Sequence, residues 1–359
     1  MAGITLDDLA HSYLPTPRSQ ADYALKPMTM TWRDGGAYAL LGSSGCGKTT
    51  LLNIISGLLT PSRGRVLFGD RDVTRLPTAD RNIAQVFQFP VVYDTMTVRQ
   101  NLAFPLRNRG VPAAQIAARV DAIARMIGME TMLDRRARGL TADAKQKISL
   151  GRGMVRQDVN AILFDEPLTV IDPHMKWELR TQLKALHREF GHTMIYVTHD
   201  QTEALTFADE VVVMSEGRVV QAGTPQSLFD RPEHTFVGYF IGSPGMNLLP
   251  ARIDGAQAIV AGTSVPLDGL YAPAQGQIGI RPDAVRLAEA GPGLPFHAAR
   301  VEDVGRHRIV RGQVAGQPFN VTVPEGETIP AAPDRVILDP ARVGVFVDDW
   351  RVEPQGRAA

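Results

Sequence analysis

Gly42-Ser43-Ser44-Gly45-Cys46-Gly47-Lys48-Thr49 is the stretch of this 359-residue sequence that decides the fold. It has the spacing G-x-x-x-x-G-K-[ST], in which a glycine-rich loop cradles phosphate groups. The apolar run 37–41 before it is typical of a strand, and the pattern from Thr49 to Ser56, stopped by Gly57, is typical of a helix. This spacing requires a loop between a strand and a helix, so the sequence predicts a nucleotide-binding α/β core.

The residues of this loop explain why phosphate is the expected ligand. Glycine lets backbone N–H groups approach phosphate oxygens, and the N-terminus of the next helix adds a favourable dipole. Lys48 adds a point charge, the Thr49 hydroxyl suits Mg²⁺, and Cys46 is interpreted as a small residue that fits the loop. The expected nucleotide contacts are Gly42, Ser43, Ser44, Gly45, Cys46, Gly47, Lys48, Thr49 and Thr50.

A second apolar run, 161–164, ends in two adjacent carboxylates, Asp165 and Glu166. In enzymes with such a phosphate loop, an aspartate at a strand end holds Mg²⁺. A neighbouring glutamate is placed to orient or deprotonate the attacking water. Strands often end in acidic turns, so the pair alone is a weak signal. Its position downstream of the phosphate loop favours the catalytic interpretation.

The chain changes character near residue 235. Over residues 1–235, short β-rich runs alternate with helical patterns, which predicts an α/β domain with a mostly parallel sheet. Within it, about 97–158 is helical by pattern and lacks a strand run, so we expect a helical insertion there. Over 236–359, Gly and Pro become frequent and short alternating segments such as 308–314 predict a small antiparallel β domain or barrel.

Composition limits the class of protein. The 38 Lys+Arg balance 38 Asp+Glu, and a zero net charge gives no whole-molecule attraction for nucleic acid. Cys46 is the only cysteine, which excludes an intramolecular disulfide and a cysteine-built zinc site. No stretch approaches the about 18 uncharged apolar residues of a membrane-spanning helix. Residues 1–10 do not resemble a signal peptide, so we expect a cytoplasmic protein.

These motifs, in this order, resemble those of ABC transporter ATPases. The resemblance implies a P-loop NTPase with a RecA-like parallel-sheet core, antiparallel β and helical subdomains, and ATP with Mg²⁺ as ligands. It identifies Gln88, in the stretch 85–90, with the glutamine that reaches Mg²⁺ or the attacking water when the subdomains close. It identifies His199, in the stretch 196–200, with the histidine that contacts the γ-phosphate.

Two more residues match the family pattern. Tyr13 lies where the family stacks an aromatic ring on adenine, and Asp172, in 168–172, matches the D-loop aspartate. Each match has an alternative: Tyr13 could be surface packing, and Asp172 could simply cap the helix that Pro173 starts. In the same way, Gln88 could be a polar residue at a strand end and His199 a neighbour of a helix cap. Their joint order and spacing favour the functional interpretation.

The C-terminal region resembles the regulatory OB-like extension of the sugar and polyol importers within this family. The segment 236–247 is similar to the junction of that subgroup, and 279–283 is similar to a marker of its β domain. The resemblance therefore covers nearly the whole chain. A generic small β domain without a ligand is the alternative for this part.

One motif departs from the family. The signature, normally Leu-Ser-Gly-Gly-Gln, aligns with 140–144, where Thr141 keeps a hydroxyl but Ala142 and Asp143 replace the glycines. In the family this loop clamps the γ-phosphate bound to the other subunit. Asp143 would place an anion near phosphate, and like charges in a partly desolvated interface repel strongly. We therefore favour a heterodimer with a second ATPase that has a regular signature, and a working homodimer is the alternative.

The resemblance implies an ATPase that powers import of a carbohydrate or polyol. The altered signature and the wording of 87–94 resemble one ATPase of the two-ATPase glycerol importers of proteobacteria. A homodimeric ATPase of a sugar or glycerol-3-phosphate importer is the alternative. The implied partners are two transmembrane permease subunits and, indirectly, an external solute-binding protein, at the cytoplasmic face of the bacterial inner membrane. Other classes are a soluble ABC protein outside transport and a catalytically silent regulatory subunit.

Overall fold

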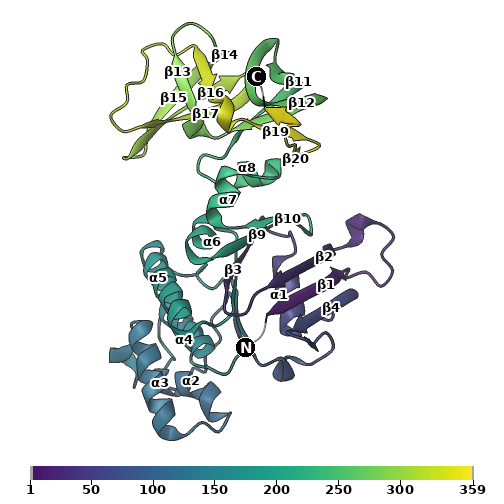
Figure 1. Ribbon diagram of the computed structural model, residues 1–359. Coiled ribbons are helices and arrows are strands. Elements are labelled where there is room, and N and C mark those ends of the chain that lie inside the picture. The colour runs from purple at the N-terminus through teal and green to yellow at the C-terminus, as the bar shows by residue number, and fades with distance from the viewer. Residues whose placement is uncertain (1–2, 358–359) are drawn as a thin grey trace. The chain divides into compact units, whose positions relative to one another are not determined.

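The computed structural model describes residues 3–357, and the chain divides after Pro225 into two compact units (Figure 1). The first unit is an α/β structure around a mixed sheet, and the second is built mainly of β-strands. The predicted fold class, an α/β P-loop core followed by a β region, is confirmed.

A six-stranded sheet forms the centre of the first unit, in the order β10-β9-β3-β8-β7-β6. Its strands are β3 (Ala37–Gly42), β6 (Ile83–Val86), β7 (Ala161–Asp165), β8 (Met194–Thr198), β9 (Glu210–Ser215) and β10 (Arg218–Gly223). Neighbouring strands are parallel except for β9 and β10. Parallel strands that are covered on both faces are typically apolar, and β3 and β8 are buried at every position.

An antiparallel sheet in the order β2-β1-β4-β5 completes the strands of this unit. It consists of β1 (Ile4–His11), β2 (Leu25–Trp32), β4 (Arg63–Phe68) and β5 (Arg71–Asp72). One apolar core joins it to the central sheet through α1 (Lys48–Ser56), and it contains Trp32, Leu51 and Val197. The helix that follows the phosphate loop is therefore anchored by both sheets.

The other helices of the first unit are α2 (Val98–Arg107), α3 (Ala113–Met126), α4 (Ala142–Met154), α5 (Pro173–Phe190) and α6 (Gln201–Phe207). Helices α2, α3 and α4 lie between β6 and β7 in the chain, and Figure 1 shows them grouped together. Helix α5 begins as its sequence predicts, because Asp172 is the N-cap and Pro173 is the first helical residue.

Two arginines, the buried Arg81 and the half-buried Arg119, hold the C-terminal ends of helices α1 and α4. Arg81 is 1% exposed and donates to the carbonyls of Ile54 (2.6 Å) and Ile55 (2.9 Å) in α1, and also to Thr74 and Leu76. Arg119 donates to the carbonyls of Met154 (2.9 Å) and Val155 (3.0 Å) at the end of α4. Burial lowers the pKa of both guanidinium groups. A cation at this end complements the helix dipole and satisfies the last carbonyls.

The second unit contains two short helices and three antiparallel sheets, in the orders β11-β12-β19-β20, β13-β18-β14 and β15-β16-β17, with β21 paired to β12. Its helices are α7 (Pro225–Asp230) and α8 (Thr235–Phe240). Its strands are β11 (Asn247–Val260), β12 (Thr263–Ile280), β13 (Val285–Ala288), β14 (Leu294–Pro295), β15 (His297–Asp303), β16 (His307–Val314), β17 (Gln317–Pro324), β18 (Arg335–Leu338), β19 (Gly344–Val347), β20 (Trp350–Arg351) and β21 (Gly356–Arg357).

A buried arginine attaches α7 and α8 to this β region. Arg281 is 5% exposed and donates to the carbonyls of Phe229 (3.0 Å), Gly238 (2.8 Å) and Ile241. Burial lowers its pKa to about 10. The segment 226–235, which the sequence pattern alone assigns to the first domain, therefore belongs to the second compact unit.

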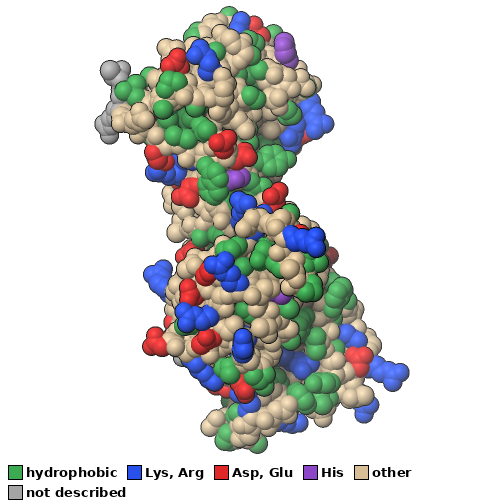
Figure 2. Space-filling model, turned by 90° about the vertical axis from the view of Figure 1, so that its right-hand side faces the viewer, with side chains coloured by type: hydrophobic (Ala, Val, Ile, Leu, Met, Phe, Trp, Pro, Cys, Tyr) green, Lys and Arg blue, Asp and Glu red, His purple; other side chains and the backbone are tan. Residues whose placement is uncertain are grey.

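No helix within residues 3–357 is both long enough and apolar enough to cross a bilayer. Figure 2 shows basic and acidic side chains interspersed over one face, in keeping with the zero net charge.

Candidate nucleotide-binding site

The phosphate loop leaves β3 at Gly42 and enters α1 at Lys48. Gly47, the N-cap of α1, has φ 101°, a left-handed conformation, and a Cβ there would lie 2.7 Å from the carbonyl oxygen of Ala24. A Cβ at Gly42 would lie 2.8 Å from the Cys46 sulfur. Both positions therefore require glycine. Since Gly47 has no side chain to cap α1, the first N–H groups of that helix are free to bind an anion.

Lys48 and Cys46 lie inside this loop. The Lys48 ammonium is 5% exposed and donates to the carbonyls of Gly42 (2.7 Å) and Ser43 (2.9 Å). It also lies 3.8 Å from the Cys46 sulfur. Burial raises the pKa of the Cys46 thiol, which disfavours the reactive thiolate. This agrees with the interpretation of Cys46 as a small packing residue.

The side-chain oxygens of Thr49 and Asp165 come together at the start of α1 and the end of β7. The Thr49 hydroxyl donates to Asp165 Oδ1 over 3.2 Å. Burial, and then the neighbouring Glu166, raise the pKa of Asp165, while the Thr49 hydrogen bond and Lys48 oppose this. A hydroxyl and a carboxylate suit Mg²⁺, which takes few protein ligands and completes its shell with phosphate and water. Residues 3–357 contain no cluster of three or more His, Cys, Asp or Glu side chains able to hold a metal.

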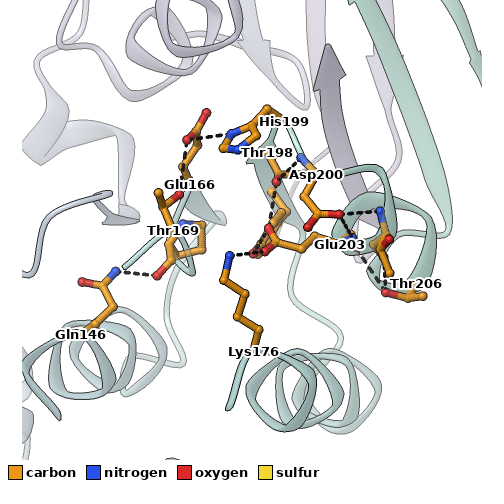
Figure 3. Close-up of polar contacts among 12 residues, drawn as sticks. Gln146, Glu166, Thr169, Lys176, Thr198, His199, Asp200, Glu203 and Thr206 are labelled. Atoms are coloured by element: carbon orange, nitrogen blue, oxygen red, sulfur yellow. Dashed lines mark hydrogen bonds and ion pairs between the residues drawn. The ribbon is translucent and has the colours of Figure 1, made fainter. Parts of the chain in front are cut away.

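Glu166 and His199 come together at the ends of β7 and β8 (Figure 3). Glu166 Oε2 lies 3.1 Å from His199 Nδ1 and accepts from the Thr169 hydroxyl over 3.3 Å. Glu166 has φ 46°, a left-handed conformation that is uncommon outside glycine, and its N–H donates to the Val197 carbonyl over 3.0 Å. The imidazole is 53% exposed and the carboxylate 19% exposed, so the pair can meet a ligand from solvent.

Tyr13, Asp172 and Gln88 are placed differently. The Tyr13 ring is 65% exposed, and its hydroxyl lies 3.1 Å from the Thr50 hydroxyl on α1, beside the phosphate loop. Asp172 caps α5 by accepting from the His174 N–H over 3.0 Å. Gln88 follows β6 and is half-buried, and within residues 3–357 no hydrogen bond joins its side chain to Thr49 or Asp165.

The segment 141–143, which the sequence analysis aligns with the family signature, lies at the start of α4. The Thr141 hydroxyl, at the N-cap, accepts from the Ala144 N–H over 3.3 Å, and Ala142 is the first helical residue. Asp143 forms an ion pair with Lys147, one helical turn later, over 3.6 Å. Its Oδ1 atom is buried without a hydrogen-bond partner within the described residues. The Lys147 ammonium therefore offsets the negative charge of Asp143. This ion pair was not predicted from the sequence.

Three further side chains around this site were missed by sequence reasoning. The fully buried Gln146 donates to the carbonyls of Phe87 (3.2 Å) and Pro167 (2.7 Å), the neighbours of Gln88 and Glu166. Glu203 and Lys176 form an ion pair behind His199. The only signal in the sequence is a polar residue on an apolar helix face. That signal does not show which backbone groups the residue will meet.

The comparisons with known proteins agree with this geometry. Residues 25–169 match the family described as ABC transporter. A solved structure described as cbiO1 from Clostridium perfringens, part of the ABC transporter complex cbiONQ, has a TM-score of 0.57 and 29% identity. That similarity covers 64% of this chain and 90% of the other.

Curated relatives match over most of the chain. The sn-glycerol-3-phosphate import ATP-binding protein UgpC of Jannaschia sp. (strain CCS1) is 39% identical over 330 residues, 91% of this chain and 93% of that protein. UgpC 3 of Agrobacterium fabrum is 42% identical and covers 85% of each chain. The sulfoquinovosyl glycerol transport ATP-binding protein SmoE of the same organism is 37% identical, over 96% of this chain and 98% of that protein.

Proposed function

The chain belongs to the ABC transporter family as an ATP-binding subunit, an ATPase that energises import, and from that premise we propose how its site works. The phosphate loop, with Lys48, binds the phosphates of ATP. Thr49 and Asp165 would hold Mg²⁺, and Gln88 would reach it when the subdomains close. Mg²⁺ would draw charge from the phosphates. Tyr13 stacks on adenine.

The observation that carries this proposal is the contact between Glu166 and His199 (3.1 Å) beside a complete phosphate loop. The Glu166 carboxylate accepts the proton of the attacking water, and His199 orients that carboxylate and meets the γ-phosphate. Asp172, at the start of α5, is the D-loop aspartate in this proposal and lies at the boundary between the two ATPase subunits. The contact argues against a catalytically silent subunit, because a silent chain has no need of this pairing.

Substitution of Glu166 tests this assignment. In the purified transporter, Glu166→Gln should retain ATP binding and lower hydrolysis by about 100-fold or more, because the amide cannot take the proton. The exposed Glu178→Gln, on α5, is the matched control and should leave hydrolysis unchanged. Full activity of Glu166→Gln would overturn the role of Glu166.

The solute follows from the relatives rather than from the site. Relatives named for import of sn-glycerol-3-phosphate or transport of sulfoquinovosyl glycerol support a glycerol-3-phosphate or sugar-like solute better than free glycerol. We propose sn-glycerol-3-phosphate as the first candidate, with glycerol or a sugar as alternatives. Uptake of each labelled solute by vesicles that contain the complete transporter would distinguish them, and uptake of glycerol alone would reverse the order.

The partner ATPase is a finer question that rests on residues 141–143 alone. The names of the relatives give no support to pairing with a second ATPase, and the Asp143–Lys147 ion pair reduces the repulsion expected from Asp143. The homodimer is therefore the better-supported form. The heterodimer requires that the isolated chain bind ATP yet hydrolyse it slowly until the second ATPase is added. Brisk hydrolysis by the pure chain would exclude it.

The proposed assembly has two permease subunits at the cytoplasmic face of the inner membrane, supplied with solute by an external binding protein. The apolar side chains Phe89 (71% exposed) and Val91 (50% exposed), next to Gln88, are suited to receive permease helices. Copurification of two apolar permease chains with the tagged protein would support this assembly. Copurification of ribosomes or nucleic acid instead would overturn it.

A further inference from the structure

A buried carboxylate contacts the residue that precedes His199. Glu203, on α6, is 3% exposed, and its Oε2 atom accepts from the Thr198 hydroxyl (2.8 Å) and the Tyr196 hydroxyl (3.0 Å). Thr198 is the last residue of β8 and immediately precedes His199. Its hydroxyl also accepts from the Asp200 N–H over 3.0 Å. Through the Thr198 hydroxyl, these hydrogen bonds connect Glu203 to the residues on both sides of His199.

The other oxygen of this carboxylate faces a different helix. Lys176 Nζ lies 3.5 Å from Glu203 Oε1, and the two side chains are 25% and 4% exposed. Lys176 lies one turn into α5, where its N–H donates to the Asp172 carbonyl over 2.9 Å. Figure 3 shows the ammonium of Lys176 pointing to Glu203 between the two helices. The ion pair thus joins the turn that carries Asp172 to the turn that carries His199.

We propose that Glu203 is a positioning residue for ATP hydrolysis, and that the Lys176–Glu203 ion pair transmits the position of the Asp172 turn to His199. Movement of the start of α5 pulls on the carboxylate, and the carboxylate holds the Thr198–Asp200 backbone. This sets the distance between His199 and Glu166. The inference rests on the proposed roles of Glu166 and His199 and adds residues that touch neither ATP nor Mg²⁺.

The burial of the two partners makes the single variants unequal. Lys176→Met leaves a charged carboxylate in a buried position without its cation, which is the more costly defect. Glu203→Gln keeps an oxygen that accepts from Thr198, and it leaves a lysine that solvent can reach. The double variant Lys176→Met/Glu203→Gln removes the uncompensated charge, so it should recover activity relative to Lys176→Met.

Helix α5 offers a matched control. Lys184 Nζ, two turns after Lys176, donates to the Thr206 carbonyl over 3.1 Å, at the far end of α6 from His199. Lys184→Met therefore removes the same chemical group and another link between the same two helices. It does not touch the turn that holds His199.

The experiment compares these variants in the assembled transporter. Lys176→Met should lower kcat about 10- to 100-fold with KM for ATP changed less than about 2-fold, since misplaced catalytic groups lower kcat while Lys48 still binds phosphate. Glu203→Gln should lose less, the double variant should recover, and Lys184→Met should match the parent. Equal losses in the Lys176 and Lys184 variants, a KM effect alone, or additive losses in the double variant would overturn the proposal.

A second readout does not need hydrolysis. In the full chain labelled with ¹⁵N-histidine, the His199 ring signals, assigned with His199→Gln, should shift in Lys176→Met and Glu203→Gln but not in Lys184→Met. Unchanged signals in all three variants would overturn the positioning role. An inactive parent transporter with shifted signals would instead mean that the proposed function is wrong and the positioning is right.

Discussion

Helices α1 and α4 end alike and begin differently. Each ends on carbonyls that accept from an arginine, Arg81 for α1 and Arg119 for α4. At its start, α1 has a glycine N-cap followed by Lys48, whereas α4 has Thr141, whose hydroxyl is used within the helix, followed by Asp143. The first start suits an anion, and the second already contains one.

This difference indicates that a helix start can bind a phosphate group only where the N–H groups of its first turn have no other acceptor. At the start of α1, no side chain caps the first N–H groups, and Lys48 adds a cation. At the start of α4, the Ala144 N–H donates to the Thr141 hydroxyl, and Asp143 is paired with Lys147. Each helix is anchored at its C-terminal end by an arginine, so we expect the functional difference between them to arise in the first turn. The following changes test that conclusion.

The largest effect is expected where the anchoring itself is removed. Arg81→Met deletes four hydrogen bonds to buried carbonyls, and it should lower the free energy of unfolding by about 3 kcal/mol. Arg119→Met loses two such bonds and a contact with the Phe190 ring, and it should cost about 1–2 kcal/mol. Urea unfolding measures both, and an equal cost would contradict this ranking.

Next comes the cation at the start of α1. Lys48→Met should weaken ATP binding by about 10- to 100-fold, the worth of a charge-assisted hydrogen bond to phosphate. Lys147→Met, at the corresponding end of α4, should change ATP binding by less than about 3-fold. Titration with a fluorescent ATP analogue measures both, and the comparison fails if the two lysines contribute equally.

A smaller effect is expected from restoring the α4 start. Ala142→Gly with Asp143→Gly should raise hydrolysis by the isolated chain about 10-fold, because backbone N–H groups and a cation then face the phosphate bound across the dimer. The same changes combined with Glu166→Gln should give no activity. If hydrolysis does not rise, the altered signature is a neutral variation and the homodimer needs no explanation.

The smallest effect concerns pH. Burial, followed by the charges of Arg119 and His187, lowers the pKa of His192, which is 4% exposed. As pH falls below about 6.5, the unfolded chain binds a proton at this residue that the folded chain does not bind. His192 therefore lowers the free energy of unfolding as the pH decreases. His192→Phe should remove part of this fall, less than about 1 kcal/mol between pH 7 and 5.5. Denaturant unfolding at both pH values measures it, with the exposed His174→Phe as control.

Sequence patterns predicted the parts of this molecule that depend on short-range rules. The loop from Gly42 to Thr49, the parallel strands and the start of α5 at Asp172 all follow from the order of neighbouring residues. The contacts of Gln146 with the carbonyls of Phe87 and Pro167, and the Lys176–Glu203 ion pair, could not be predicted, because they join residues that are distant in sequence. Likewise, the signature showed that Asp143 replaces a glycine, but only the helix geometry pairs it with Lys147.

The sequence composition and the structure place the boundary between the two units at different residues. The assignment of 226–235 to the first domain followed a change in composition, whereas the compact unit follows the carbonyls that Arg281 collects from α7 and α8. A single arginine 40 residues or more away in sequence outweighs local composition, because a buried guanidinium must satisfy its donors. Composition alone carries no such signal.

The hydrogen bonds of Lys48 to the carbonyls of Gly42 and Ser43 have a consequence for chemical modification. An exposed, deprotonated amine attacks the acyl carbon of donors such as acetyl phosphate and thioesters with its lone pair, and phosphate or thiolate leaves. With its N–H groups engaged and only 5% of its surface exposed, Lys48 should be among the slowest lysines of this chain to acetylate. Acyl donors should therefore leave intact the positive charge of Lys48, which we propose binds phosphate.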